Sequence, residues 1–459
     1  MKRMESIKRI FIFAVNIMSL FIYTGLYAYS WFDYYYPVIN NFNQGIRLYV
    51  NGHILIILLY VVILSVFSRT YGSLKIGHLK PVDVFFSQAF SLLAVNIISY
   101  FQISLMNNWV VKTRPLLLVF ICQLVVAAIW AVMCDYIYRK LFPPRDILIV
   151  YGERSIDEIS KKFFGRKDRF RITQSINISE GIETIKKTAA QFKGAVVLWD
   201  IPIEIRNILL KYLYSKSKRV YMMPKIPDVL IQGADRLHLF DTPILLTREY
   251  ALTVEQRLVK RLIDIFLSLM LIIITSPIML LTALIIRLYD KGPALFRQTR
   301  LTAGGKEFQI IKFRSMRTDA ESDGIARLAG RKDERITPIG RFIRAVRIDE
   351  LPQLFNIFIG QMSFIGPRPE RPEIIEQYLE DMPEFAFRLK MKAGLAGYAQ
   401  VYGKYNTTPY DKLKLDLAYI ESYSLWLDLK IMLLTLKILL KPDSTEGIAE
   451  SQITAMKED

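Results

Sequence analysis

Cysteine is scarce in this chain, and its position argues against the chemistry that cysteine usually performs. The 459 residues contain only two cysteines, Cys122 and Cys134, both within one apolar stretch. Their spacing puts them about 120° apart around a helix. They are therefore expected to fill apolar space in a helix, and neither a disulfide nor a cysteine-ligated metal is predicted.

A dinucleotide fingerprint and a nucleic-acid recognition pattern are also missing. The apolar segment 146–151 runs into Tyr-Gly-Glu-Arg-Ser at 151–155, which lacks the G-x-G-x-x-G needed for close approach to a pyrophosphate. This disfavours a nucleotide-sugar epimerase or dehydratase. The net charge of +18 has no accompanying pattern of stacking aromatic residues. We therefore expect an acidic membrane surface or a phosphorylated substrate, and no nucleic acid, as the partner.

Long apolar runs are abundant instead, with 52% hydrophobic residues overall. Four such runs occupy residues 10–31, 54–67, 84–106 and 116–138. All but the second reach the length of about 20 residues that crosses a bilayer. The first is too long for a signal peptide, and no small-residue cleavage site follows it. We predict four transmembrane helices within residues 1–142.

The flanking cations predict that both ends of this membrane domain are cytoplasmic. Lysine and arginine residues precede the first run, separate the second from the third, and follow the fourth. Positive charge of this kind marks the cytoplasmic side of a membrane. Lys112 and Arg114 in the third connection argue weakly against this orientation.

Residues 143–252 are expected to form a small α/β module. Two prolines at 143 and 144 break the chain, and apolar strand patterns at 146–151 and 194–199 alternate with a helical pattern. We interpret the module as structural, regulatory or oligomerising. A degenerate nucleotide-binding fold is the alternative.

A fifth apolar run, residues 262–288, is expected to enter the membrane and turn back. Basic residues lie on both sides of it, which disfavours moving either end across the membrane. Ser276 and Pro277 lie near its middle. The proline removes one helical hydrogen bond, and the neighbouring hydroxyl can satisfy the freed carbonyl. A proline-kinked spanning helix is the alternative.

Two adjacent carboxylates, Asp349 and Glu350, mark the expected start of a helix. Asp349 is placed to cap that helix, with Pro352 in the first turn. Upstream, Arg341, Arg344 and Arg347 recur every three residues, so one helix could present all three, while Phe342, Ile343 and Val346 would face the other way and pack. An ordinary capped surface helix with salt bridges would have the same local pattern.

Other basic residues near these carboxylates have constrained positions. Lys312 and Arg314 alternate with apolar residues, which puts both cations on one face of a strand. Arg368 stands between two prolines on a rigid elbow that suits a phosphate clamp or a simple turn. The polar segment 319–334 is either a flap or a surface loop, and residues 423–441 form either an interfacial helix or one buried against the domain.

Residues 253–441 resemble the bacterial sugar transferase family, the polyprenyl-phosphate hexose-1-phosphate transferases. The matching runs are Ser-Pro at 276–277, Lys-Phe-Arg-Ser-Met at 312–316, Asp-Glu-Leu-Pro-Gln at 349–353 and Phe-Ile-Gly-Pro-Arg-Pro at 364–369, followed by a glycine-punctuated loop at 394–403. The long N-terminal half resembles the long-form members, whose extra half is associated with dimerisation. One departure is Ala393, where many members have proline.

The resemblance implies a fold of four transmembrane helices, a Rossmann-like α/β module, and a monotopic, helix-rich catalytic domain at 253–459 with a re-entrant helix. It implies that a UDP-sugar, with glucose or galactose as the guess, gives its hexose 1-phosphate to undecaprenyl phosphate and releases UMP. The enzyme would start exopolysaccharide, capsule or O-antigen synthesis at the cytoplasmic face of the bacterial inner membrane. The long-form resemblance adds a homodimer to these expectations.

By the same resemblance, Asp349 is the nucleophile that forms an aspartyl-phosphosugar, and Glu350 helps to hold Mg²⁺ beside it. Lys312, Arg314, Arg344 and Arg368 would bind the phosphate oxygens. Two alternatives remain open. One is a metal-dependent polyprenyl glycosyltransferase that releases UDP, and the other is a non-enzymatic membrane scaffold of polysaccharide assembly.

Overall fold

The computed structural model describes residues 2–42, 50–152, 154–247, 251–317, 333, 335–403 and 407–439. The chain divides into two compact units, Met1–Pro224 and Lys225–Asp459. The division falls inside segment 143–252, so that the end of this segment belongs to the second unit. The expected flap at 319–334 lies almost wholly outside the described residues.

The first unit begins with long apolar helices. Helix α1 (Lys2–Ser30) continues through a π-helical turn, Trp31–Tyr35, into α2 (Tyr36–Phe42). It is followed by α3 (Val50–Tyr71), α4 (Pro81–Met106) and α5 (Arg114–Leu141). Five helical segments in the described chain are long and apolar enough to cross a membrane, and four of them are in this region. Both cysteines of α5 are free.

A closed network of neutral hydrogen bonds lies inside this helical region. The Tyr60 hydroxyl donates to Asn96 Oδ1 at 3.1 Å, and Asn96 Nδ2 donates to Gln123 Oε1 at 2.8 Å. Gln123 Nε2 returns to the Tyr60 hydroxyl at 2.9 Å and also reaches the Tyr23 carbonyl at 3.0 Å. Side chains of α3, α4 and α5 and a backbone carbonyl of α1 therefore satisfy one another, as burial requires.

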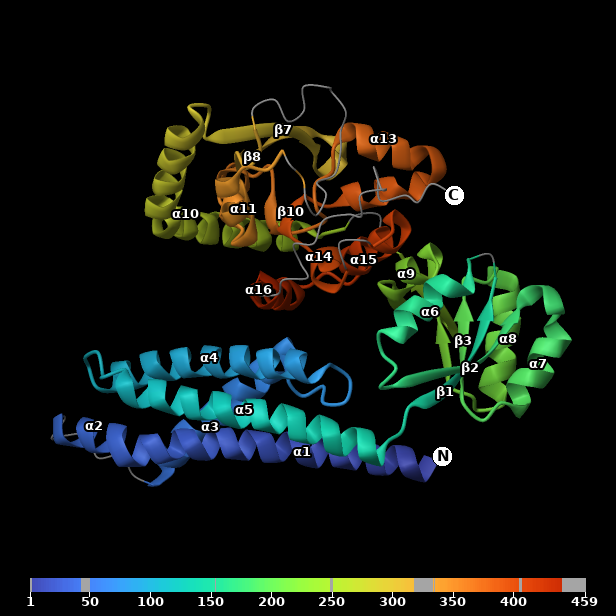
Figure 1. The fold of residues 1–459 in the computed structure, drawn as a ribbon, viewed down its shortest axis with the longest axis horizontal. Helices are drawn as coiled ribbons and strands as arrows, with labels where there is room; N and C mark the ends of the chain where they lie inside the picture. The colour runs from blue at the N-terminus through green and yellow to red at the C-terminus, as the bar shows by residue number, and fades with distance from the viewer. Residues whose placement is uncertain are drawn as a thin grey trace. The chain divides into compact units, whose positions relative to one another are not determined.

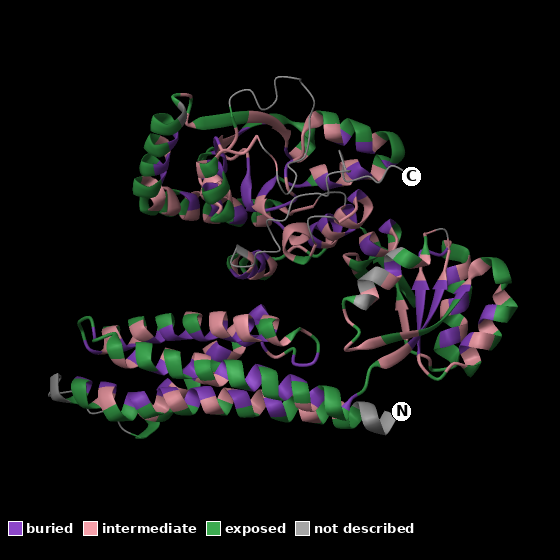
Figure 2. Cartoon of the chain, in the orientation of Figure 1, coloured by how far each residue is buried: buried purple, intermediate pink, exposed green. Residues whose placement is uncertain are grey.

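The rest of the first unit is a four-stranded parallel sheet with the order β2-β1-β3-β4. Its elements are β1 (Arg145–Tyr151), α6 (Ile156–Phe164), β2 (Phe170–Asn177), α7 (Ile182–Gln191), β3 (Ala195–Trp199), α8 (Ile203–Ser215) and β4 (Val220–Met222). Alternate residues of β1 pack into separate clusters, Leu148 and Val150 with α7 and α8, and Ile147 and Ile149 with α6. Figure 2 shows the buried central strands between these helices. The predicted small α/β region is confirmed.

The second unit combines short strands with helices. It contains α9 (Ile226–Gln232), the hairpin β5 (Asp235–Leu239) and β6 (Thr242–Leu246), α10 (Val254–Asp290), and the antiparallel pair β7 (Leu295–Leu301) and β8 (Glu307–Phe313). Then follow α11 (Pro338–Ala345), α12 (Gln353–Ile359), β9 (Ser363–Ile365), α13 (Pro372–Asp381), β10 (Gly394–Ala396), α14 (Tyr398–Tyr402), α15 (Pro409–Glu421) and α16 (Leu425–Leu439). Strands β9 and β10 are parallel.

A large hydrophobic core holds much of the second unit together. It joins residues of β8, α12, α15 and α16, including Ile310, Ile357, Leu417 and Ile431. Helix α16 contributes Ile431 to this core, but Trp426 on the same helix is 54% exposed. One face of the helix therefore lies in the core, and its outer face exposes the apolar residues Leu425, Trp426, Leu429 and Leu436.

Helix α10 bends sharply between two arms (Figure 1). It starts with a capping box in which Thr253 and Gln256 exchange hydrogen bonds. Pro277 lies inside the helix, and a proline is the usual cause of a sharp kink. The Ser276 hydroxyl donates at 2.8 Å to the carbonyl of Ile273, the carbonyl that Pro277 cannot reach for lack of an N–H.

Candidate active site

The two predicted carboxylates lie in a tight turn between α11 and α12. Residues Ile348–Glu350, here called the carboxylate turn, form one 3₁₀ turn, which Arg347 precedes in a left-handed conformation at φ 59°. Helix α12 begins only at Gln353, after Pro352, so the prediction that Asp349 caps a helix is wrong. The left-handed residue redirects the chain before the carboxylates.

Helix α11 carries only part of the predicted basic face. It ends at Ala345, so Arg347 does not share a helix with Arg341 and Arg344. On the other side, Ile343 is buried, but Phe342 is 65% exposed and Val346 49% exposed. The prediction that all three apolar residues pack is therefore wrong for two of them, because the short helix contacts the domain along a narrow stripe.

Asp349 is a half-buried carboxylate with an unused acceptor. Its Oδ1 has no hydrogen-bond partner among the described residues. Burial, followed by the negative charge of Glu350, raises the pKa of Asp349 to about 6, against the opposing effect of Lys312, Arg344 and Arg347. The side chain is therefore mostly ionised at pH 7, and an oxygen is available to a reacting group.

Glu350 is held by arginines. Its Oε1 accepts a hydrogen bond from Arg368 Nη2 at 3.2 Å and lies 3.7 Å from Arg347 Nη1. Burial by itself raises the pKa of Glu350, but the charges of Arg368, Lys312 and Arg347 outweigh it and lower the pKa to about 2. Glu350 is thus ionised throughout the physiological range.

Lys312, at the end of β8, interacts with both carboxylates. Burial lowers the pKa of Lys312 to about 8, and the charge of Arg368 acts in the same direction. The charges of Glu350 and Asp349 oppose this shift. The structure therefore brings together Asp349, Glu350 and three of the four predicted phosphate-binding cations, Lys312, Arg344 and Arg368.

Arg314, the fourth predicted cation, has different surroundings. Strand β8 ends at Phe313, and the backbone N–H of the buried Arg314 donates to the Ala294 carbonyl at 2.9 Å. Its side chain lines a small cavity with Tyr289 and Thr337. It also lies against Gly292, where an added Cβ would be 2.2 Å from Arg314 Nη1. Its role in phosphate binding stays a prediction.

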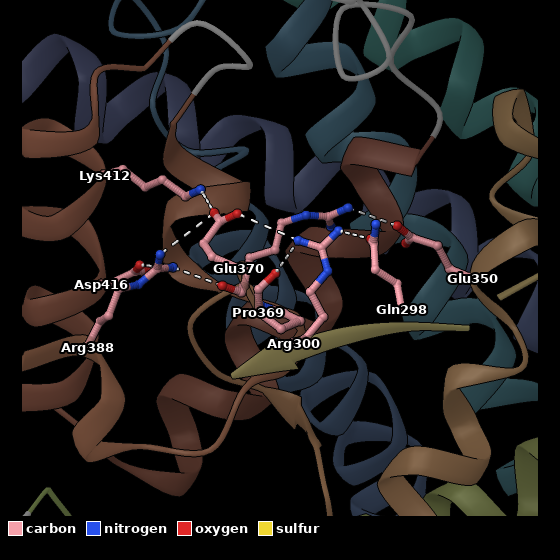
Figure 3. A network of polar contacts seen from close by, with 9 residues as sticks. Gln298, Arg300, Glu350, Pro369, Glu370, Arg388, Lys412 and Asp416 are labelled. Atoms are coloured by element: carbon pink, nitrogen blue, oxygen red, sulfur yellow. Dashed lines mark hydrogen bonds and ion pairs between the residues drawn. The ribbon is translucent and has the colours of Figure 1, made fainter. Parts of the chain in front are cut away.

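A second charged network surrounds Glu370, directly after the Pro-Arg-Pro run (Figure 3). Glu370 pairs with Lys412, and its carboxylate lies 3.7 Å from Arg388 and 3.9 Å from Arg300. Burial raises the pKa of Glu370, but the charges of Lys412, Arg388 and Arg300 lower it to about 2. Arg388 also pairs with Asp416 at 2.8 Å.

This network holds the backbone that presents Arg368. Arg388 Nη2 donates to the Arg368 carbonyl at 2.9 Å, and Arg300 Nη1 donates to the Pro369 carbonyl at 3.3 Å. Sequence reasoning missed Glu370 and its partners. Its place beside Pro369 was a local sign, but Arg388 and Asp416 follow too far along the chain for any local pattern to connect them.

The glycine-punctuated loop supports the same segment from the other side. Gly366 N donates to the Ala396 carbonyl and Gly394 N to the Pro367 carbonyl, both at 2.9 Å. A Cβ at Gly394 would lie 2.1 Å from Gly366 N, so both backbones depend on glycine for their close approach. Ala393, where many family members have proline, donates its backbone N–H to Thr302 Oγ1 at 3.1 Å. A proline could not make this bond.

The carboxylates of Asp349 and Glu350 could bind a metal ion together with a substrate. Among the described residues, no three His, Cys, Asp or Glu side chains cluster as a metal site. Asp349 and Glu350 provide two carboxylates, and the Oδ1 of Asp349 is unused. Magnesium is commonly held by one or two carboxylates together with substrate phosphates. These two residues therefore fit Mg²⁺ bound with a phosphorylated substrate.

The chain is similar to known sugar transferases. The family model described as bacterial sugar transferase matches residues 255–442. A UDP-glucose:undecaprenyl-phosphate glucose-1-phosphate transferase of Caulobacter vibrioides is 43% identical over 190 residues, which are 40% of this chain and 71% of that protein. A protein of the same name from Klebsiella pneumoniae is 40% identical over 304 residues, 65% of this chain and 60% of that protein.

A third relative differs in the sugar of its name. The UDP-N-acetylgalactosamine-undecaprenyl-phosphate N-acetylgalactosaminephosphotransferase of Aeromonas hydrophila is 41% identical over 185 residues. The match covers 40% of this chain and 44% of that protein. The chain thus matches less than two thirds of the Klebsiella and Aeromonas relatives.

Proposed function

Because this chain belongs to the bacterial sugar transferase family, we propose that it transfers a hexose 1-phosphate from a UDP-sugar to undecaprenyl phosphate. The reaction would start the assembly of an exopolysaccharide, capsule or O-antigen. The observation that carries the proposal is the carboxylate turn, where the partly unpaired Asp349 lies beside the arginine-bound Glu350. The names of the relatives support both substrates.

The reaction would take place in two displacements at one phosphorus atom. A carboxylate oxygen of Asp349 attacks the sugar-bearing phosphorus of the UDP-sugar, and the bond to the bridging oxygen breaks, so that UMP leaves with that oxygen. An oxygen of undecaprenyl phosphate then attacks the same phosphorus and frees the Asp349 carboxylate. No proton transfer is needed, since both nucleophiles are already anionic. Dividing the reaction in this way lets two anionic substrates react in turn.

The surrounding charges have matching roles. Lys312, Arg344 and Arg368 would bind phosphate oxygens and stabilise the charge that spreads over them in the transition state. Asp349 and Glu350 would hold Mg²⁺, which when bound neutralises part of the pyrophosphate charge. Arg368 and Arg347 keep Glu350 ionised for this role.

We further propose that α10 is re-entrant, so that the catalytic unit sits at the cytoplasmic face of the inner membrane. Both arms of α10 pack on the same unit. Asp264, before Pro277, bonds strand β9, whereas Met279 and Ile286, after it, pack with Phe313 and Ile343. A spanning α10 would have to divide this packing across the bilayer. Exposed Leu262, Phe266, Leu280 and Leu284 leave apolar surface for lipid on both arms.

The N-terminal helices would anchor the chain as four transmembrane spans, and homodimerisation through the long N-terminal half stays part of the proposal. The parallel strand order β2-β1-β3-β4 supports the proposal of a Rossmann-like module. Its Gly152 lies so close to the Asp200 carbonyl that a Cβ would be 2.4 Å away. This close packing of the turns after β1 and β3 supports a structural role over nucleotide binding.

The decisive experiment identifies the released nucleotide. Detergent-solubilised full-length protein would be incubated with Mg²⁺, undecaprenyl phosphate and, in separate reactions, UDP-glucose, UDP-galactose, UDP-N-acetylglucosamine and UDP-N-acetylgalactosamine. We expect UMP and a lipid diphosphosugar from one of them. Release of UDP would instead indicate direct glycosyl transfer, and no release from any of them would favour a scaffold. The matched control is Asp349→Asn, for which we expect no UMP.

A further inference from the structure

We propose that Asp264 is a positioning residue that acts from within α10 to hold strand β9 and thereby aligns Arg368 with the carboxylate turn. Asp264 Oδ1 accepts two hydrogen bonds, from the backbone N–H of Phe364 at 3.0 Å and from the Ser363 hydroxyl at 3.1 Å. Asp264 is 4% exposed and Ser363 is fully buried. This inference rests on the proposed function, because transfer activity is its readout.

A carboxylate at this place in an apolar helix is unexpected unless it has a specific task. Lys260, Asp264 and Ser268 follow one another at four-residue spacing, and all three are buried. Leu262 and Phe266, on other faces of the same arm, are 58% and 67% exposed. Burying an ion is costly unless it is paired and hydrogen-bonded. The polar stripe therefore faces the folded unit, and the apolar faces remain for lipid.

Lys260 connects the same stripe to the C-terminal helices. Its Nζ lies 2.5 Å from Asp428 Oδ2 on α16, and the Tyr419 hydroxyl on α15 donates to Asp428 Oδ1 at 2.6 Å. Helix α10 is thus held at one point by a buried ion pair and, one turn later, bonds β9 through Asp264. Both groups reach β9: the Tyr419 hydroxyl donates to the Ile365 carbonyl at 3.3 Å from α15, whereas Asp264 bonds Ser363 and Phe364 directly from α10.

The chain from β9 to Arg368 is short and held at each step. Phe364 is four residues before Arg368, and Gly366 is bound to Ala396 in the glycine loop. Pro367 and Pro369 restrict the backbone on both sides of Arg368. Arg388 holds the Arg368 carbonyl, and the guanidinium of Arg368 reaches Glu350 at 3.2 Å. A displacement of β9 is therefore transmitted to Arg368 and Glu350.

A graded set of variants tests this role in the full-length protein. Asp264→Ala removes both hydrogen bonds to β9, Ser363→Ala removes one, and Asp264→Asn keeps an oxygen that can accept both. Ser268→Ala is the matched control, since among the described residues the Ser268 hydroxyl bonds only carbonyls of its own helix, at 2.5 Å and 3.1 Å. The measurement is kcat for UMP release with undecaprenyl phosphate and the UDP-sugar, of the four, that the wild type turns over, per folded molecule, beside the thermal midpoint in detergent.

We expect Asp264→Ala to lower kcat by about 10- to 100-fold, since a displacement of about 1 Å at an active site can have that effect. Asp264→Asn should recover most of this loss, Ser363→Ala should fall between them, and Ser268→Ala should match the wild type. An Asp264→Ala protein with wild-type kcat overturns the inference. So does an Asp264→Asn protein as impaired as Asp264→Ala, because hydrogen bonding to β9 would then not explain the loss.

Two controls keep the result interpretable. If Asp264→Ala does not fold, Ser363→Ala decides, and wild-type kcat in that variant overturns the inference. If the wild type releases no UMP from any of the four sugar nucleotides, the proposed function fails on its own account. An active wild type with unaffected variants identifies a failure of the Asp264 inference alone.

Discussion

The carboxylate turn and the Glu370 network contain similar side chains but balance their charges differently. Glu370 is surrounded by Arg300, Arg388 and Lys412, and its pKa is lowered to about 2. Asp349 has its pKa raised to about 6 and an oxygen without a hydrogen-bond partner among the described residues. Glu370, which is surrounded by cations, holds a loop in place, whereas Asp349 has an oxygen available for chemistry. We therefore expect substitution of Asp349 to reduce activity and substitution of Glu370 to reduce stability.

The largest expected effect is on catalysis, from Asp349→Asn. We expect UMP release to fall by at least about 10³-fold, the order of loss seen when a catalytic nucleophile is removed. Stability should be unchanged or higher. A raised pKa means that the folded state disfavours the ionised carboxylate at neutral pH, so removing the charge removes that unfavourable term. Nucleotide release and the thermal midpoint in detergent measure both. Retained activity would disprove the role of Asp349.

For Glu370→Gln, in contrast, we expect the main effect to be a loss of stability. Arg388 is 2% exposed, and loss of Glu370 removes one of its two carboxylate partners, so that Asp416 alone remains against its buried charge. Breaking a buried ion pair in this way typically destabilises by about 3 kcal/mol or more. Glu376→Gln, on the exposed side of α13, is the control and should change stability by less than about 0.5 kcal/mol. Equal effects of the two variants in denaturant titrations would show that the network around Glu370 is not structural.

The pH dependence of activity tests the ionisation of Asp349 and of Lys312. Asp349 must be ionised to attack, so with a pKa of about 6 activity should fall about tenfold between pH 7 and pH 5. Lys312, whose pKa is lowered to about 8, loses its charge above that pH. The expected profile of initial rates is therefore bell-shaped. An acid limb near pH 4 would mean that Asp349 titrates like an exposed aspartate.

The smallest effect is expected in the long apolar helices of the first unit, where the polar network is closed and neutral. Gln123→Leu removes the hydrogen bonds to Tyr60, Asn96 and the Tyr23 carbonyl. Such bonds between membrane helices contribute about 1 kcal/mol. We expect a slightly lower unfolding midpoint and unchanged UMP release per folded molecule. A large loss of activity would give this region a catalytic role that its closed network does not suggest.

Sequence patterns correctly predicted those features that depend on residues close together in the chain. The apolar runs correspond to long helices, and Ser276 satisfies the carbonyl that Pro277 leaves free, as its adjacency indicated. The carboxylate pair and the basic residues around it were also recognisable from their order along the chain. The predictions of a continuous basic helix and of a capping role for Asp349 failed, because the backbone conformation of one residue changes the direction of the chain there. Arg347 in a left-handed conformation ends the basic helix face early and moves Asp349 out of the capping position.

The sequence by itself determined the long apolar helices, the small α/β region and the family, because hydrophobic length and motif order are properties of neighbouring residues. Only the tertiary structure decided which charges meet. Glu370 finds Arg388 and Lys412, and Asp264 finds Ser363, across long separations along the chain. These contacts depend on how helices and strands pack. They determine that Glu370 is surrounded by cations and that Asp349 has an oxygen left to react.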